Sequence, residues 1–417
     1  MKIASTLLLF VASTLTPLSA EDWPNWRGPS QNGISSEKGL NFDWPEDGPK
    51  LVWQVDGCGK GYASVSVSQG NIFTIGNKNG GEHLTAFDEK SGMELWSTKF
   101  GTSGHSNGTP TVDGDFVYAI GRDGDLICCK TSNGEIVWQK RFDKDFGGKM
   151  MSGWGYSESP LIDGDHLICT PGGKDNMIVA LDKKTGEKIW GSKSGDDGDR
   201  GKDGAGYSTV VISEAAGVKQ YIQLTGRGII SVRAKDGRQL WNYNRIANNT
   251  ANIPTPIVTG DHVFCSTGYG TGSALLKLSK KGATGVKAEE VYFLEADTLQ
   301  NHHGGMIRIG KHIYTGHKHN NGFPICVDIT TGDIIWGGDE RGPGSGSAAI
   351  TAADGHLIFR YQNGIIALIE ATPDGYNLKA QFKPVHQEKE SWAHPVIANG
   401  KLILREQDKL MCYDLSK

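Results

Sequence analysis

Histidine residues are concentrated in one short part of this 417-residue sequence. Five of the twelve histidines lie in a single interval, between His302 and His319. Imidazole is a common ligand of zinc and copper and the usual acid–base group near neutral pH. These side chains could bind a divalent metal or act in catalysis, or they could instead hydrogen-bond the backbone of their glycine-rich loops. The candidate metal ligands are His302, His303, His317 and His319.

A second group of candidate site residues precedes the strands that begin near Pro110, Pro160, Pro256 and Pro395. Aligned on these prolines, most apolar positions repeat, whereas these positions vary and are rich in aromatic, histidine and amide groups. Variation at one position among otherwise equal repeats suggests contact with a ligand or partner that lacks the symmetry of the repeats. Alternatively, these side chains fill a central channel together with hydrogen-bonded water. The candidate ligand-binding residues are Tyr62, Trp154, Tyr156, Tyr207, Asn252, His302, His303, Trp392 and His394.

Two arginines could add positive charge to the same face. Arg360 and Arg405 are expected in loops between the second and third strands of their repeats. Guanidinium groups bind carboxylates through paired hydrogen bonds, so converging arginines would favour an anionic ligand such as a tricarboxylate quinone. The alternative is a solvated rim in which neighbouring acidic residues neutralise this charge.

The elements that must position these residues form a repeat. In NMIVALDKKTGEKIW, Asn176 to Trp190, two apolar runs flank a glycine-containing turn, which predicts a β-hairpin. Copies of this segment recur with closing aromatic residues 42 to 52 residues apart, and this period predicts an all-β, eight-bladed β-propeller. The closing residues are Trp53, Trp96, Trp138, Trp190, Trp241, Phe293, Trp336 and Phe382.

One copy is divided between the two ends of the chain. Leu410–Leu415 supplies its first half, and Leu51–Trp53 supplies an isolated closing strand. We therefore expect the N-terminal strand at residues 51–55 to pair with the C-terminal strands. This pairing closes the ring and leaves no blade incomplete.

Composition limits the classes of function. The formal charge of −4 gives no electrostatic reason to expect nucleic acid or an anionic membrane as a partner. Of the seven cysteines, Cys128, Cys326 and Cys412 occupy a position that holds small residues in other repeats. This pattern predicts buried packing rather than disulfides, and an odd number leaves at least one free thiol.

The N-terminus is divided into two segments ahead of the propeller. Residues 1–20 combine Lys2, an apolar run and small residues at Ser19–Ala20, which predicts a secretory signal peptide too short to span a membrane. No cysteine follows the expected cleavage point, so no lipid anchor is indicated, and we expect a periplasmic or secreted protein. Residues 21–50 are predicted to form a strap packed on the ring, and residues 51–417 form the propeller.

The pattern apolar–x–Ala–apolar–Asp–x–x–Thr–Gly–x–x–x–Trp resembles the repeat of the PQQ-like (pyrrolo-quinoline quinone) β-propeller family over Leu51 to Lys417. That family includes quinoprotein alcohol dehydrogenases, the lipoprotein BamB and exported proteins of undefined role. The resemblance implies that each tryptophan packs between its own blade and the next. The dehydrogenases of that family have a disulfide between two consecutive cysteines in a loop beside the quinone, whereas Cys128–Cys129 lies on an expected strand. A calcium-binding carboxylate set and a CxxCH haem sequence are also absent from the sequence.

Two functions are compatible with these features. The leading hypothesis is a non-catalytic binding or scaffold module that requires no cofactor and holds a protein, a polymer or a small anionic ligand on its channel face. The alternative is a PQQ-dependent dehydrogenase with its cofactor at the channel mouth. In that case Trp154 or Trp392 would stack on the quinone, Arg360 or Arg405 would bind its carboxylates, and His302 or His394 would act as the base.

Overall fold

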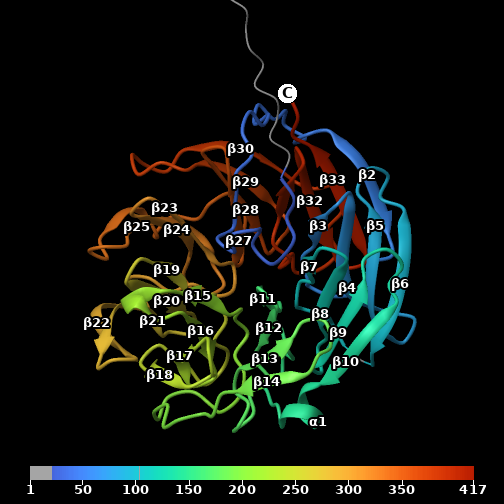
Figure 1. Cartoon of the computed structure of the whole chain (residues 1–417). Coiled ribbons are helices and arrows are strands. Elements are labelled where there is room, and N and C mark those ends of the chain that lie inside the picture. The colour runs from blue at the N-terminus through green and yellow to red at the C-terminus, as the bar shows by residue number, and fades with distance from the viewer. Residues whose placement is uncertain (1–20, 103) are drawn as a thin grey trace, which may run out of the picture.

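Eight sheets, seven of four strands and one of five, form a ring in the computed structural model, which describes residues 21–102 and 104–417 (Figure 1). The predicted signal peptide, residues 1–20, lies outside the described residues. The sheets are the blades of a propeller, so the predicted all-β, eight-bladed fold is confirmed. The described helices are α1 (Phe142–Phe146) and the 3-10 turn η1 (Ala215–Gly217), and neither has the length that a membrane span needs.

Each blade contributes four strands in order from the channel outward. The innermost strands are β3 (Ser66–Ser68), β7 (Thr111–Asp113), β11 (Leu161–Asp163), β15 (Val211–Ser213), β19 (Ile257–Thr259), β23 (Met306–Ile309), β27 (Ala348–Ala353) and β31 (Val396–Ala398). The second strands are β4 (Asn71–Lys78), β8 (Phe116–Ile120), β12 (His166–Cys169), β16 (Gln220–Thr225), β20 (His262–Thr267), β24 (His312–His317), β28 (His356–Tyr361) and β32 (Lys401–Glu406). The third strands are β5 (Gly81–Asp88), β9 (Asp125–Lys130), β13 (Val179–Asp182), β17 (Gly228–Arg233), β21 (Gly272–Lys281), β25 (Phe323–Asp328), β29 (Ile366–Glu370) and β33 (Lys409–Asp414). The outermost strands are β6 (Glu94–Gly101), β10 (Ile136–Arg141), β14 (Lys188–Gly191), β18 (Gln239–Tyr243), β22 (Gly285–Glu295), β26 (Ile334–Gly337), β30 (Leu378–Phe382) and β2 (Leu51–Asp56).

The ring closes through the N-terminal strand β2. This strand is the outermost strand of the eighth blade and pairs antiparallel with β33, with Leu51 opposite Tyr413 and Trp53 opposite Cys412. Head and tail of the chain therefore share one sheet, as the divided repeat predicts.

Both faces of each sheet are buried because neighbouring blades pack on either side. In β9, Leu126 and Cys128 pack toward the third blade, with Leu167 and Leu181, whereas Cys129 on the opposite face packs toward the first blade. This alternation is the period of two that strands impose on side chains. All seven cysteines are buried and free in the described part of the chain, which confirms the prediction that they serve packing.

The closing tryptophans join each blade to the next. Trp138 Nε1 donates to the carbonyl of Lys183 at 3.0 Å, and its ring lies against Gly186, where an added Cβ would come within 2.8 Å of the indole. Gly186 has a φ of 71°, so glycine is favoured at this position for its backbone conformation as well as for space. In the seventh blade the register differs, because Phe382 lies opposite Ile366 rather than opposite the small residue Ala367.

The segment before β2 crosses the inner strands of several blades. Trp23 exchanges two backbone hydrogen bonds with Val67 of the first blade, at 2.9 and 2.8 Å. Farther along, strand β1 (Ile34–Ser35) adds to the seventh blade as a parallel neighbour of β27. This segment, residues 21–50, is called the strap below.

Candidate functional site

A cavity of about 380 Å³ opens at the mouth of the central channel. Most of its lining comes from the segments that lead into the innermost strands, and the remainder comes from loops between second and third strands and from the strap. The lining residues are Trp26, Arg27, Tyr62, Asn107, Trp154, Ser157, Tyr207, Thr209, Ala251, Ile253, Pro254, Thr255, Tyr269, His302, His303, Gly305, His319, Asn320, Gln362, Trp392 and His394.

The strap forms the floor of this cavity. Its backbone pairs with residues inside the innermost strands, such as Val67 and Ala352, which follow the lining residues in their blades. The strap therefore lies deeper in the channel than the lining loops, and its residues Trp26 and Arg27 face the cavity from below. The Trp26 ring packs against the imidazole of His394, with 4.4 Å between ring centroids.

Seven of the predicted ligand-binding residues line this one cavity. They are Tyr62, Trp154, Tyr207, His302, His303, Trp392 and His394. Tyr62 packs against Trp392 at 4.6 Å between centroids, whereas Trp154 stands at the rim with 55% of its surface exposed. The variable positions before the innermost strands therefore do meet around one space.

Two residues from the same positions are turned away from the cavity. The Tyr156 hydroxyl donates to the carbonyl of Pro171 at 2.8 Å, and its ring packs on Phe142. The Asn252 amide donates to the carbonyls of Thr225 and Gly226 and is fully buried. Both side chains hold loops in place and are absent from the cavity lining.

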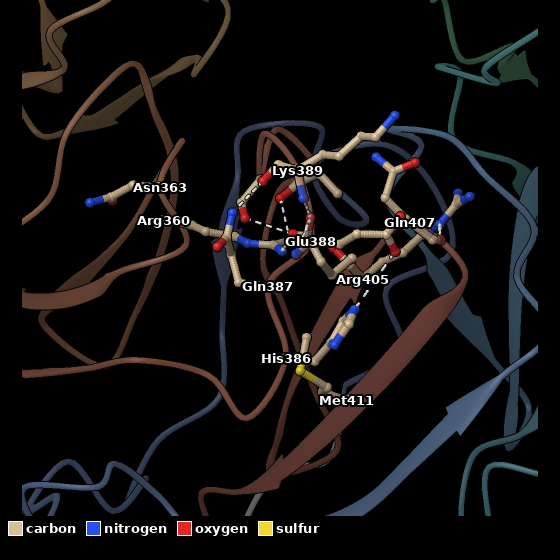
Figure 2. A network of polar contacts seen from close by, with 12 residues as sticks. Arg360, Asn363, His386, Gln387, Glu388, Lys389, Arg405, Gln407 and Met411 are labelled. Atoms are coloured by element: carbon tan, nitrogen blue, oxygen red, sulfur yellow. Dashed lines mark hydrogen bonds and ion pairs between the residues drawn. The ribbon is translucent and has the colours of Figure 1, made fainter.

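Arg360 and Arg405 also lie outside the cavity lining, and the structure corrects their predicted placement in loops. They belong to strands β28 and β32, so their side chains point into the packed space between blades and are 1% and 2% exposed. Figure 2 shows Arg360 and Arg405 in one network of polar contacts. Arg360 forms an ion pair of 2.7 Å with Glu406, and Arg405 donates to backbone carbonyls including that of Ile75. Protein groups therefore occupy Nη1 and Nη2 of Arg360 and all the donor nitrogens of Arg405.

Three of the four histidines predicted as metal ligands come together. The His302 ring lies 4.3 Å from that of His303 and 4.0 Å from that of His319, measured between centroids. His317 lies apart, because it is buried and its Nδ1 accepts a hydrogen bond from the Gln300 amide at 3.2 Å. Among the residues that the structure describes, no three His, Cys, Asp or Glu side chains are arranged to hold a metal ion.

The imidazoles of the cavity are neutral at physiological pH. Burial lowers the pKa of His302 to about 2 and that of His303 to about 3, and the neighbouring imidazoles add to the effect. Burial and then the positive charge of Arg27 lower the pKa of His394 to about 3. Desolvation disfavours the charged form of each ring, so these side chains offer neutral donors and acceptors to a ligand.

Several polar atoms of the lining have no partner. The atoms are His303 Nε2, His319 Nδ1, His394 Nδ1 and Arg27 Nε, each buried without a hydrogen bond in the described structure. Buried polar atoms in native proteins nearly always find a partner in the protein, in water or in a ligand. Water or a ligand in the cavity can supply the partners of these atoms.

The strap contributes two residues to the site that the sequence did not indicate, Trp26 and Arg27. Trp26 and Arg27 belong to the segment predicted to pack on the ring, and neither residue is among the predicted site residues. The available signal was an arginine between a tryptophan and Gly28 in a short Pro- and Gly-rich segment, but nothing in the sequence gives the path of that segment through the channel.

Comparison with known proteins gives consistent results. A family model described as outer membrane protein assembly factor BamB matches residues 80–338. BamB of Shewanella oneidensis is 22% identical over 228 residues, which make up 53% of this chain and 52% of that protein. This chain thus spans about half the length of the curated relatives it matches.

Solved structures extend the likeness to the whole ring. BamB from Moraxella catarrhalis superimposes with a TM-score of 0.60 at 12% identity, over 88% of this chain and 97% of that one. Quinohemoprotein alcohol dehydrogenase from Comamonas testosteroni gives a TM-score of 0.64 at 12% identity, over 95% of this chain and 81% of that one. At such low identity, these two likenesses concern the fold alone.

Proposed function

Because the chain belongs to the family of the outer membrane protein assembly factor BamB, a family of PQQ-like β-propellers, we propose that it is a binding or scaffold module. It would receive a protein, a polymer or a small ligand in the cavity of its channel face. The observation that carries this proposal is the cavity lining, in which aromatic rings surround neutral imidazoles with unpartnered nitrogen atoms. Concave sites with apolar walls and a few placed polar groups are typical ligand sites.

A quinone-dependent dehydrogenase is less well supported by the residues of the cavity. The calcium ion of such enzymes needs oxygen ligands that include carboxylates, and no described lining residue is Asp or Glu. Cys128 and Cys129, which would have to form a disulfide beside the quinone, are free thiols buried in β9. The lining does not fit this cofactor with its metal, so no cofactor-dependent reaction is proposed.

We further propose that the protein acts outside the cytoplasm. The name of its relatives places their role in assembly at the outer membrane, and the first 20 residues have the composition of a secretory signal. A periplasmic location would give the channel face access to exported proteins or envelope polymers.

Filling the cavity tests the binding proposal. Ser157 is half-buried in the lining and makes only a 3.3 Å hydrogen bond to the Gly155 carbonyl, so Ser157→Trp should occupy the cavity without unfolding the ring. Immobilised wild-type protein is expected to retain a partner from an envelope extract of the native cells, and the variant at least about tenfold less of it.

The matched control changes an exposed residue far from the channel. Ile189 lies on the outermost strand β14 with 48% of its surface exposed, and Ile189→Ser should retain the partner as the wild type does. A Ser157→Trp protein with an unchanged melting temperature and undiminished partner recovery would contradict the proposal.

A further inference from the structure

The positive charge of the cavity floor has no counter-ion. Arg27 is 4% exposed, and it forms no ion pair in the described structure. Its Nη2 donates to the carbonyls of Asn32 and Met306, whereas Nε and Nη1 have no hydrogen-bond partner among the described residues. Burying a cation without a partner is costly, so a group that neutralises it would bind there with a favourable free energy.

The surroundings of Arg27 are free of competing acidic groups. Arg27 is the sole charged residue of the described lining, since Asp, Glu and Lys are absent from it. Glu390 interacts with Tyr62 at the edge of the cavity, and Glu406 is already paired with Arg360 between blades. An anion entering the cavity therefore meets one unpaired guanidinium and no fixed negative charge in the lining.

The backbone holds Arg27 in an uncommon conformation. Its φ of 64° lies in the left-handed region, which bulky side chains rarely adopt, and its carbonyl accepts a 2.9 Å hydrogen bond from the Gly33 amide. Such strain persists where the surrounding structure requires it and is frequent at ligand sites. Here the residue held in this conformation lines the cavity.

His394 and Arg27 converge over Gly305. A methyl group at Gly305 would lie 3.2 Å from His394 Cε1 and 3.4 Å from Arg27 Nη1, so the two side chains border the same small space. His394 Nε2 donates to the carbonyl of His303 at 3.3 Å, because a carbonyl can only accept. In the neutral ring Nδ1 then carries a lone pair, and this buried acceptor has no donor.

These features together define a complementary ligand. The guanidinium needs an anion of planar, forked shape, such as a carboxylate, while the free lone pair of His394 needs a hydroxyl donor. Trp392, Tyr62 and Trp154 also line the cavity, and aromatic side chains offer packing surface to a ring. Amides and hydroxyls of the lining, among them Asn107 and Gln362, can bond further hydroxyl groups.

We propose that the cavity binds a ring-shaped hydroxy carboxylate, with its carboxylate on Arg27 and a hydroxyl on His394. This inference rests on the proposed function and specifies the ligand class of the same site. Two sources share the chemistry: a sugar acid, whether free or as a unit of a polymer, and a phenolic acid. The strap is then part of the binding site as well as a structural segment.

Ligand-observed NMR titrations of the full-length protein test this assignment with matched pairs of probes. D-glucuronate is compared with neutral D-glucose, and 4-hydroxybenzoate with neutral 4-hydroxybenzyl alcohol. At least one acid should bind about tenfold or more tightly than its neutral counterpart, a difference typical of a charge-assisted hydrogen bond. The pair that shows the preference identifies the source.

Arg27 variants show whether this residue causes the preference. Arg27→Gln should weaken binding of the acid at least about tenfold and leave the neutral probe unchanged, while Arg27→Lys should keep part of the preference because it keeps the charge. Arg308→Gln is the matched control, since Arg308 lies on β23 outside the cavity lining and donates to the Gly310 carbonyl. It should behave as the wild type.

Equal binding of acids and neutral probes by the wild-type protein would overturn the inference without any variant. A preference that survives in Arg27→Gln would overturn the role of Arg27. If neither acid binds more tightly than its neutral counterpart but Ser157→Trp still retains less of its partner than the wild type, the proposed binding function is supported and the proposed ligand class is wrong. The two failures are therefore distinguishable.

Discussion

Arg405→Met is expected to destabilise the protein by about 3–5 kcal/mol, the range for removing one member of a buried charged network. Arg405 Nη1 donates to the Ala63 and Ile75 carbonyls and to Thr74 Oγ1, at 3.0, 2.6 and 2.9 Å. Its remaining donors reach the carbonyls of Gly59 and Gln407. Methionine fills a similar volume but leaves these buried acceptors unsatisfied between the eighth and first blades.

Urea unfolding followed by tryptophan fluorescence measures this effect. Arg308→Met removes an arginine with a single hydrogen bond to the Gly310 carbonyl, and we expect its midpoint to stay near that of the wild type. An Arg405→Met midpoint equal to that of Arg308→Met would contradict the assigned role.

The ion pair between Arg360 and Glu406 is expected to show strong energetic coupling. Each residue is 1% exposed, and Glu406 also accepts hydrogen bonds from Ser391 Oγ at 2.6 Å and from the Lys389 amide at 3.1 Å. Arg360→Met leaves a buried carboxylate without its cation and should cost about 3–5 kcal/mol. Arg360→Met with Glu406→Gln should cost less than the sum of the single changes, by about 1–3 kcal/mol.

A double-mutant cycle of urea unfolding measures the coupling. Additive effects, within about 0.5 kcal/mol, would mean that the pair contributes no specific interaction. That result would also remove the argument that these arginines are committed to the fold and not to a ligand.

The propeller was predictable from the sequence because each repeat contains the residues that pack neighbouring blades together. Trp138 and Gly186 are needed together, since the indole of one blade lies on the turn glycine of the next, and this requirement recurs through the ring. The divided eighth blade follows from the same pattern. Trp53 lies on a closing strand that is not preceded by the other strands of a blade, so its partner had to come from the C-terminal end of the chain.

The cavity was only partly predictable. The position of a residue in its repeat indicates which segment it belongs to, but not the direction in which its side chain points. Tyr156 lies two residues from Trp154, yet it turns into the core while Trp154 stands at the rim. Arg360 and Arg405 are predicted in loops, but strands β28 and β32 extend past them, to Tyr361 and Glu406. Their side chains therefore lie between blades. Arg27 was missed because its place depends on how the strap crosses the channel, which no local pattern encodes.

Site-specific photo-cross-linking tests most directly the claim that the channel face is the binding surface. A benzophenone amino acid would replace Trp154 at the cavity rim or Ile189 on an outermost strand, two apolar side chains with 55% and 48% of their surface exposed. Irradiation of the native cells is expected to give a discrete cross-linked species from position 154 and none from position 189. Cross-links from position 189 alone, or equally from both positions, would contradict the account.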